Sequence, residues 1–184
     1  LDLYKEQQRV SQQPNLLLET QLWALGSIYV AGIDEVGRGA WAGPVVAAVV
    51  ILPSQSPNLT QLLDPVRDSK LLTPKAREAC HDLILEHAID HGVGFVSAVE
   101  IDRDGIVSAT QEAMRRALMA LRKTPDHLLI DYVKLPRVPI PQYSMPKGDL
   151  YCLSIAAASI IAKVSRDRWM VELEKSLPGY GFAQ

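Results

Sequence analysis

The sequence lacks the features that define several common classes of protein. Only two cysteines, Cys80 and Cys152, occur among 184 residues, so we exclude a disulfide framework and expect both to be packing residues. The longest uninterrupted apolar run, residues 45–52, is far shorter than the roughly 18 residues that a membrane span needs. Nothing like a signal sequence precedes the fold. We therefore expect a soluble protein of the reducing cytoplasm, without a membrane partner.

The sequence also lacks an excess of positive charge. Nineteen Lys and Arg residues stand against twenty-one Asp and Glu residues, which gives a formal net charge of −2. A protein that binds nucleic acid through bulk positive charge is normally basic, so any contact with phosphate must here be local. Bound divalent ions can supply that charge, because such ions are often the largest local charges in a site.

Signatures of a zinc site are absent as well. The four histidines show neither a pairing with cysteine nor a His-Glu-x-x-His spacing. Three of them, His81, His87 and His91, fall on or just after the polar face of an expected helix. We expect these three side chains to be solvated.

The most informative stretch places two adjacent carboxylates, Asp34 and Glu35, after an apolar segment and before a glycine-rich turn. Residues 28–33 are typical of a buried strand, and a buried sheet tolerates little unpaired charge, so we expect this strand to end or bend at the acids. The apolar run 45–52 then forms a second strand, expected to be antiparallel to the first. A solvated turn with two surface acids is the alternative interpretation.

The rest of the chain alternates helical and strand patterns, which predicts a single α/β domain. Thr73-Pro74 is a typical helix start, because threonine caps a helix and proline suits its first position. We expect a helical extension over residues 1–26 and a main domain over residues 27–184, with helices over 74–88, 106–122 and 150–176 and strands over 92–99 and 127–131.

Two further carboxylates follow from this arrangement. Asp131 ends the strand expected to neighbour the strand of Asp34, and ligands in such sheets collect at strand ends where the topology switches. Asp149 precedes the last helix, where a metal ligand and a helix N-cap are both possible roles. Asp167 lies about four turns further along the same helix, too far to share an ion, and we assign it to a structural ion pair.

Several blocks, taken in order, resemble type 2 ribonuclease H (RNase HII). The family's first strand carries an Asp-Glu-x-Gly-Arg-Gly signature, and the other blocks follow here in the family's order over residues 28–182. The blocks are Asp34-Glu35-Val36-Gly37-Arg38-Gly39, Asp68-Ser69-Lys70, Leu129-Ile130-Asp131, Lys147-Gly148-Asp149, and a run from Ser154 to Asp167.

This resemblance implies an RNase H-like fold, with a mixed five-stranded sheet flanked by helices. It implies an endonuclease, expected to be monomeric, that cuts the RNA strand of RNA/DNA hybrids and cuts 5′ to ribonucleotides embedded in duplex DNA. Two Mg²⁺ or Mn²⁺ ions would serve the reaction, which leaves 5′-phosphate and 3′-hydroxyl ends. The four acidic residues that match the family's metal centre and its catalytic residues are Asp34, Glu35, Asp131 and Asp149.

The substrate contacts implied by the resemblance begin with the turn Gly37-Arg38-Gly39, which touches the ribonucleotide in the family. Glycines leave room for the backbone to approach a ribose, whose 2′-hydroxyl distinguishes RNA from DNA. Three lysines, Lys70, Lys147 and Lys163, are candidate phosphate contacts, of which Lys70 is the strongest because of its Asp-Ser-Lys block.

Two features depart from the family. Tyr132 occupies the position after the third aspartate, where the family commonly has glycine, and a bulky side chain there could alter the turn or the groove. The chain stops at Gln184, where the family normally continues into a histidine-lysine-glycine-tyrosine segment, so we expect a truncated tail.

Two alternatives stay open. Type 3 ribonuclease H normally has lysine at the position of Arg38 and a larger N-terminal domain than residues 1–26 provide. A non-catalytic hybrid-binding module is the alternative from a different functional class. A divalent-metal-dependent cleavage assay separates an enzyme from a binding module.

Overall fold

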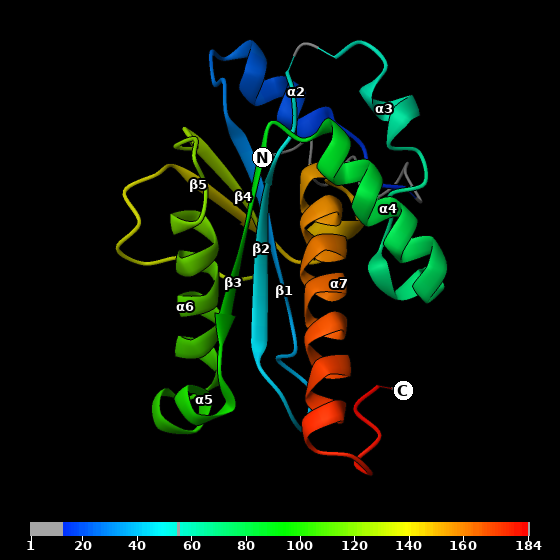
Figure 1. The fold of residues 1–184 in the computed structure, drawn as a ribbon. Helices are drawn as coiled ribbons and strands as arrows, with labels where there is room; N and C mark the ends of the chain where they lie inside the picture. Colours follow the sequence, from blue (N-terminus) through cyan, green and yellow to red (C-terminus); the bar gives the residue numbers. More distant parts are fainter. Residues whose placement is uncertain (1–12, 55, 184) are drawn as a thin grey trace.

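A mixed five-stranded sheet forms the centre of the molecule (Figure 1). The computed structural model describes residues 13–54 and 56–183. Across the sheet the strand order is β3-β2-β1-β4-β5, which confirms the expected α/β architecture. The strands are β1 (Val30–Val36), β2 (Val45–Ile51), β3 (Asp90–Val96), β4 (His127–Asp131) and β5 (Gln142–Met145).

Strand direction divides the sheet into two parts. β2 pairs antiparallel with both β1 and β3, as expected for the first two strands. β4 runs parallel to β1, and β5 runs parallel to β4. All of β2 is buried, in agreement with its uninterrupted apolar sequence, because a strand covered on both faces has no side that must be polar. The parallel pair brings the carboxyl ends of β1 and β4 to the same edge of the sheet.

Helices cover both faces of the sheet, and each face has its own buried cluster of apolar side chains. Small buried residues allow close packing: Ala109, Ala113 and Ala117 lie on the helix over residues 106–119, and Ala156, Ala157, Ala158 and Ala162 lie on the helix over residues 153–176. Within the described residues, no helix combines the length and apolar character needed to cross a membrane. One face carries α5 (Ala98–Asp104) and α6 (Ile106–Met119), and the other carries α4 (Pro74–His87) and α7 (Leu153–Ser176) (Figure 1).

The segment before the sheet packs onto the start of α7. Helix α2 (Leu17–Ala24) turns Leu18, Leu22 and Trp23 toward an apolar cluster. Glu19 is fully buried, and its Oε1 accepts hydrogen bonds from the Ser154 backbone N–H at 2.8 Å and the Cys152 thiol at 3.2 Å. The expected helical extension therefore has a packed helix within residues 13–26, and the rest of that prediction, residues 1–12, lies outside the described residues.

Several expected boundaries and roles were wrong. The strand expected over residues 92–99 is β3, which ends at Val96, because Ser97 caps α5 through a capping box with Glu100. His81 is buried on α4 rather than solvated, and its Nδ1 lies 3.0 Å from an oxygen of Asp82. Elements that the sequence patterns did not indicate are α3 (Leu59–Leu62), η1 (Ser69–Leu71), α5, β5 and η2 (Gly148–Leu150).

Gly32 allows β1 to lie against the backbone of α7, and this contact generates the first prediction. A Cβ at Gly32 would overlap backbone atoms of Ser154 and Ile155, neither of which can rotate away. We expect Gly32→Ala to lower the free energy of unfolding by about 3 kcal/mol or more, at the upper end of overpacking costs. Gly39→Ala is the control, because a Cβ there meets nothing within 4 Å. Equal stabilities of the two variants in chemical denaturation would contradict this account.

Candidate metal centre

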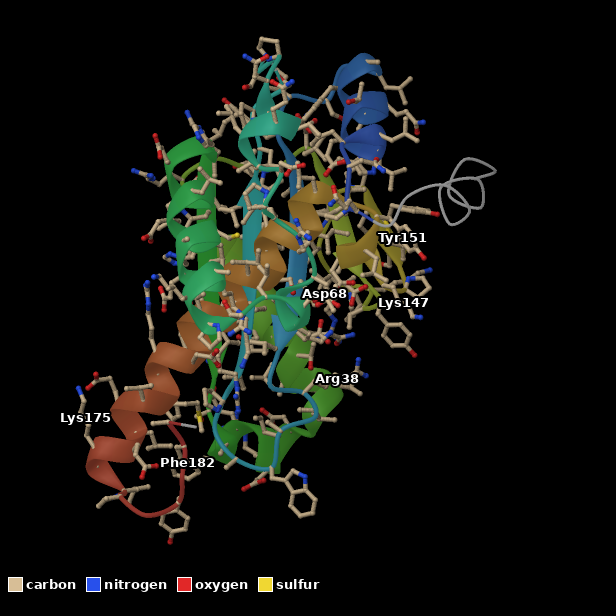
Figure 2. The ribbon with its side chains drawn as sticks, turned by 90° about the vertical axis from the view of Figure 1, so that its right-hand side faces the viewer. Arg38, Asp68, Lys147, Tyr151, Lys175 and Phe182 are labelled. Atoms are coloured by element: carbon tan, nitrogen blue, oxygen red, sulfur yellow. The ribbon has the colours of Figure 1, made fainter. Side chains whose placement is uncertain are left out.

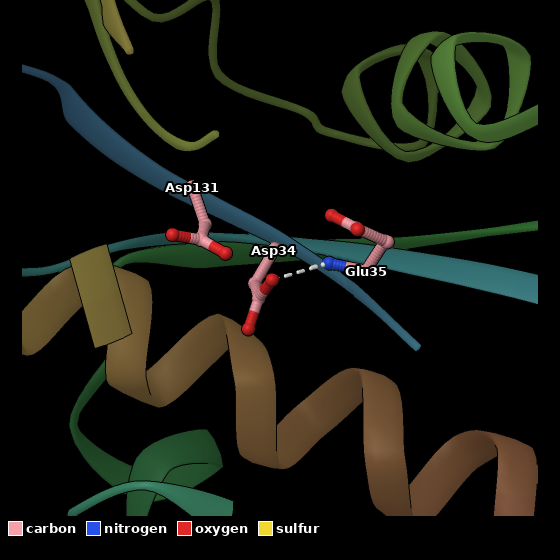
Figure 3. Close-up of side chains that lie close together, drawn as sticks. All are labelled: Asp34, Glu35 and Asp131. Atoms are coloured by element: carbon pink, nitrogen blue, oxygen red, sulfur yellow. Dashed lines mark hydrogen bonds between the residues drawn. The ribbon is translucent and has the colours of Figure 1, made fainter. Parts of the chain in front are cut away.

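Asp34 and Glu35 lie within β1 rather than after it. The strand continues through both acids to Val36, and they pair with Ala48 and Ala47 of β2. The strand was expected to end or bend at the acids, and it ends one residue beyond them. Asp34 is 5% exposed and points toward α7, and its Oδ1 accepts a hydrogen bond from the Glu35 N–H at 2.7 Å (Figure 3).

Asp131 joins these two acids from the neighbouring strand. Ile33 pairs with Ile130 in the parallel register of β1 and β4, so the next residues along the two strands are Asp34 and Asp131. Carboxylate oxygens of Asp34, Glu35 and Asp131 all lie within 4.8 Å of one another (Figure 3). The expected convergence of carboxylates from neighbouring strands is thus present.

Asp149 lies in the short helix η2, just before α7. Its role as an N-cap of the long helix is excluded, because the N-cap residue of α7 is Cys152. The neighbouring Gly148 N–H donates to Asp131 Oδ1 at 2.7 Å, which ties η2 to the end of β4. Asp149 is outside the tight group of three acids but lines the same cavity.

A cavity of about 500 Å³ contains all four acids and the four candidate cations. Figure 2 labels Arg38 and Lys147 along the same side of the fold. Four other residues that line this cavity had no expected role, although three of them fall inside the matching blocks. These residues are Val36, Ser69, Pro146 and Ser159, and Tyr132 also lines the cavity.

Ser69 and Ser159 hold one wall of the cavity together. Their hydroxyl oxygens lie 3.1 Å apart, which joins η1 to α7. The backbone N–H of Lys70 donates to Asp68 Oδ1 at 2.9 Å, and Arg77 Nε donates to the Ser69 carbonyl at 3.0 Å. This frame places the exposed Lys70 near the acids. Burial raises the pKa values of Glu35, Asp131 and Asp149, and the positive charge of Lys70 opposes part of that rise.

Lys163 is held differently from the other candidate cations. Its Nζ donates to Asp167 Oδ1 at 2.5 Å, and Asp167 also accepts from Arg77 Nη1 at 3.1 Å. The expected structural ion pair of Asp167 is therefore present, with two partners. Lys163 lines the cavity, but a carboxylate already holds its ammonium group.

The two glycines of the turn have different surroundings. Gly37 has φ +96°, and a Cβ there would lie 2.5 Å from the Pro44 carbonyl oxygen and 2.7 Å from Arg166 Nε. Arg166 is buried and donates to the Pro44 and Ala42 carbonyls, so it fixes the loop after the turn. Gly39 has open space around it. Glycine is thus required by the protein's own packing only at Gly37.

Burial raises the pKa of every acid in the cluster, and repulsion from neighbouring acids adds to this rise at Asp34, Glu35 and Asp149. Burial, followed by the charges of Glu35 and Asp131, raises the pKa of Asp34 well above its ordinary value. Burial and the charge of Asp131 raise the pKa of Glu35 to about 7, and the same causes raise the pKa of Asp149 to about 6. Burial raises the pKa of Asp131 as well. Without a cation, this cluster does not readily hold its full negative charge.

The residues fit a divalent metal ion. All candidate ligands are carboxylate oxygens, which are the hard ligands that Mg²⁺ and Mn²⁺ prefer. Glu35 Oε2 is buried, and it has no hydrogen-bond partner among the described residues. The nearest cation to Glu35 is Arg38, whose Nη1 lies 3.9 Å from Oε1, which is long for an ion pair. A cation at this cluster would satisfy the unpartnered oxygen.

This sheet, with its acidic cavity rimmed by cations, defines an α/β nuclease of the ribonuclease H type. A family model described as Ribonuclease HII matches residues 31–184. The chain belongs to the ribonuclease HII family.

Known proteins agree with this assignment. The chain is 50% identical over 171 residues to Ribonuclease HII of Dehalococcoides mccartyi, covering 93% of this chain and 80% of that protein. The structure of ribonuclease H2 from Pyrococcus horikoshii OT3 aligns with TM-score 0.73 and 32% identity, over 83% of this chain and 79% of that chain. Bst-RNase HIII in complex with Mn²⁺ aligns with TM-score 0.66 and 25% identity, over 90% of this chain and 59% of that chain.

The raised pKa values predict how Asp34→Asn changes stability without divalent metal. An acid whose pKa is raised on folding stabilises the fold below its unfolded pKa, and that stabilisation is lost as pH rises through the folded pKa. For Glu35 this pH window runs from the ordinary pKa of 4.5 to the raised pKa of about 7. Asp34→Asn removes one repelling charge, so we expect its free energy of unfolding at pH 7.5 to exceed that of the wild type by roughly 1 to 3 kcal/mol.

The measurement is thermal unfolding in EDTA between pH 4 and pH 7.5. We expect the difference between the two proteins to shrink at acid pH, where the acids are protonated in both. A wild type that is as stable as Asp34→Asn at pH 7.5 would show that the acids do not repel one another.

Proposed function

We propose that this protein is an endonuclease that hydrolyses the RNA strand of RNA/DNA hybrids and cuts 5′ to ribonucleotides embedded in duplex DNA. The products would carry 5′-phosphate and 3′-hydroxyl ends. The observation that carries this proposal is the group of three carboxylates, Asp34, Glu35 and Asp131, in a cavity that also holds Lys70. We further propose residues 27–184 as the catalytic domain.

The four acids would hold two divalent ions, Mg²⁺ or Mn²⁺. Asp34, Glu35 and Asp131 supply oxygens close enough to share one ion, and Asp149 would complete the centre from η2. The Mn²⁺ complex of Bst-RNase HIII, a protein of similar fold, supports this assignment. When bound, two such ions activate the attacking water and stabilise the leaving oxygen in an in-line displacement.

The cations would bind and orient the substrate backbone. Lys70 and Lys147 line the cavity beside the acids, where they can reach phosphates next to the cut. Lys163 is a weaker candidate, because its ammonium group is bound to Asp167. Local contacts of this kind agree with the net charge of −2, because the protein has no general excess of positive charge.

The turn Gly37-Arg38-Gly39 would read the ribose. Gly37 sets the course of the loop through its contact with Pro44 and Arg166, and Gly39 leaves the backbone uncovered on the open side. Backbone groups can therefore approach a 2′-hydroxyl in a shallow minor groove, where that hydroxyl distinguishes RNA from DNA. The Arg38 side chain extends from this turn toward the acids, with Nη1 3.9 Å from Glu35 Oε1.

Substitution of the acids tests the metal centre. We expect Asp34→Asn and Asp131→Asn to abolish cleavage of an RNA/DNA hybrid in Mg²⁺ or Mn²⁺, because each keeps the side-chain size and removes a charge that holds cations. Circular dichroism should show an intact fold. Asp167→Asn is a matched control outside the acidic group, and we expect it to remain active. Normal hydrolysis by a folded Asp34→Asn protein would contradict this metal centre. A wild-type protein that binds hybrids without cutting them would favour the alternative of a non-catalytic binding module.

The open glycine tests the recognition of ribose separately from metal binding. Gly39→Ala adds a methyl group where the protein itself has room, so any loss must come from the substrate. A misplacement of about 1 Å can cost on the order of 100-fold in rate. We expect Gly39→Ala to bind Mn²⁺ normally in calorimetry and to lose most cleavage of a DNA duplex with one ribonucleotide.

Gly37→Ala should lose activity too, but with a fall in stability, because its Cβ meets Pro44 and Arg166. If Gly39→Ala cuts both the single-ribonucleotide duplex and a continuous hybrid at the wild-type rate, the turn is only a strand connector.

A further inference from the structure

Tyr132 has a backbone conformation that tyrosine rarely adopts. Its φ is +57°, in the left-handed region where most residues other than glycine are strained. The surrounding structure imposes this conformation: the Tyr132 N–H donates to the Met145 carbonyl at 2.8 Å, and the Val133 N–H donates to the Asp131 carbonyl at 2.6 Å. Glycine would fit the backbone better, so the tyrosine side chain must be explained by something other than the turn.

The ring of Tyr132 does not contribute to the core. The residue is 64% exposed, follows Asp131 directly and lines the acidic cavity. Its ring contacts Arg38, whose guanidinium carbon lies 5.5 Å from the ring centroid. Arg38 comes from the loop after β1 and Tyr132 from the end of β4, so this contact connects the glycine-rich turn to the strand that carries Asp131.

Arg38 has two competing partners. Glu35 attracts its guanidinium from inside the cavity, but the closest approach is 3.9 Å. A tight ion pair with Glu35 would occupy an oxygen that the proposed metal centre uses and would withdraw the cation from the substrate. The Tyr132 ring attracts the same guanidinium without supplying a charge, because the face of an aromatic ring is electronegative. The ring can thus orient Arg38 and leave its positive charge available.

We propose that Tyr132 is a positioning residue, whose ring holds the Arg38 guanidinium at the mouth of the cavity for the phosphate backbone of an RNA-containing strand. This inference rests on the proposed function. The effect should be largest on a DNA duplex with a single ribonucleotide, where one junction must supply all the recognition. A continuous RNA/DNA hybrid offers many equivalent positions and should be less sensitive.

The test is a double-mutant cycle on cleavage of both substrates in Mn²⁺, with Tyr132→Leu, Arg38→Ala and the double variant. We expect Tyr132→Leu to lower kcat/KM on the single-ribonucleotide duplex by roughly tenfold, mainly through a higher KM, in the range of an oriented cation–π contact. Tyr132→Phe keeps the ring and should restore kcat/KM to within about twofold of the wild type. In the Arg38→Ala background, Tyr132→Leu should cause no further loss.

A second pair of variants separates positioning from a structural role. Tyr132→Gly relieves the positive φ, so we expect it to unfold at a higher temperature than the wild type and still lose activity as Tyr132→Leu does. Arg137→Gly is the matched control: its φ is +67°, and Arg137 does not line the cavity. Arg137→Gly should gain stability without the rise in KM.

Three results would overturn the inference. Additive losses in the cycle would mean that the ring contacts the substrate independently of Arg38. A Tyr132→Gly protein that is less stable and less active would make the tyrosine a structural residue. If Tyr132→Leu cuts at the rate of an active wild type, the ring has no role, but the proposed function stands. Failure of the proposed function would look different, because the wild type would then cut neither substrate.

Discussion

Repulsion between carboxylates at one corner of a buried sheet is the constraint around which this protein is organised. Burial raises the pKa values of Asp34, Glu35 and Asp131, and the charge of Asp131 raises those of Asp34 and Glu35 further. The charged acids would therefore separate if their backbones could move. The fold prevents this by building the acids into paired strands. Gly32 lets β1 lie against the backbone of α7, and the register of β1 and β4 leaves Asp34 and Asp131 side by side.

The fold could be predicted where hydrophobic pattern and local signals agree. The uninterrupted apolar run of β2 and the Thr73-Pro74 start of α4 both gave the correct element. β5 could not be found in this way, because Gln142–Met145 is a short, mostly half-buried strand without an apolar run. Ser97 and Glu100 have the spacing of a capping box, which indicates the start of α5. The strand expected over residues 92–99 overlaps this start and was therefore too long.

The sequence indicated which types of residue gather at the candidate site, but it indicated only part of their arrangement in space. The matching blocks brought Asp34, Glu35 and Asp131 together correctly, because strand ends at one edge of a sheet converge. The different roles of the two turn glycines depend on Arg166, which is distant in sequence. The second partner of Asp167, Arg77 on α4, is likewise distant in sequence. Contacts between distant segments are what a single sequence does not specify locally.

Sequence rules fail most informatively at the cavity itself. Asp90 shows how the same chain treats a buried carboxylate outside it: three backbone N–H groups donate to Asp90, and its pKa is lowered despite burial. Glu35 instead has an oxygen with no hydrogen-bond partner in the described part of the chain, and Tyr132 has a strained backbone. Proteins violate such rules at functional sites, where charge and strain serve binding rather than stability. Glu35 and the strained Tyr132 therefore line the same cavity, and Arg38 approaches both of them.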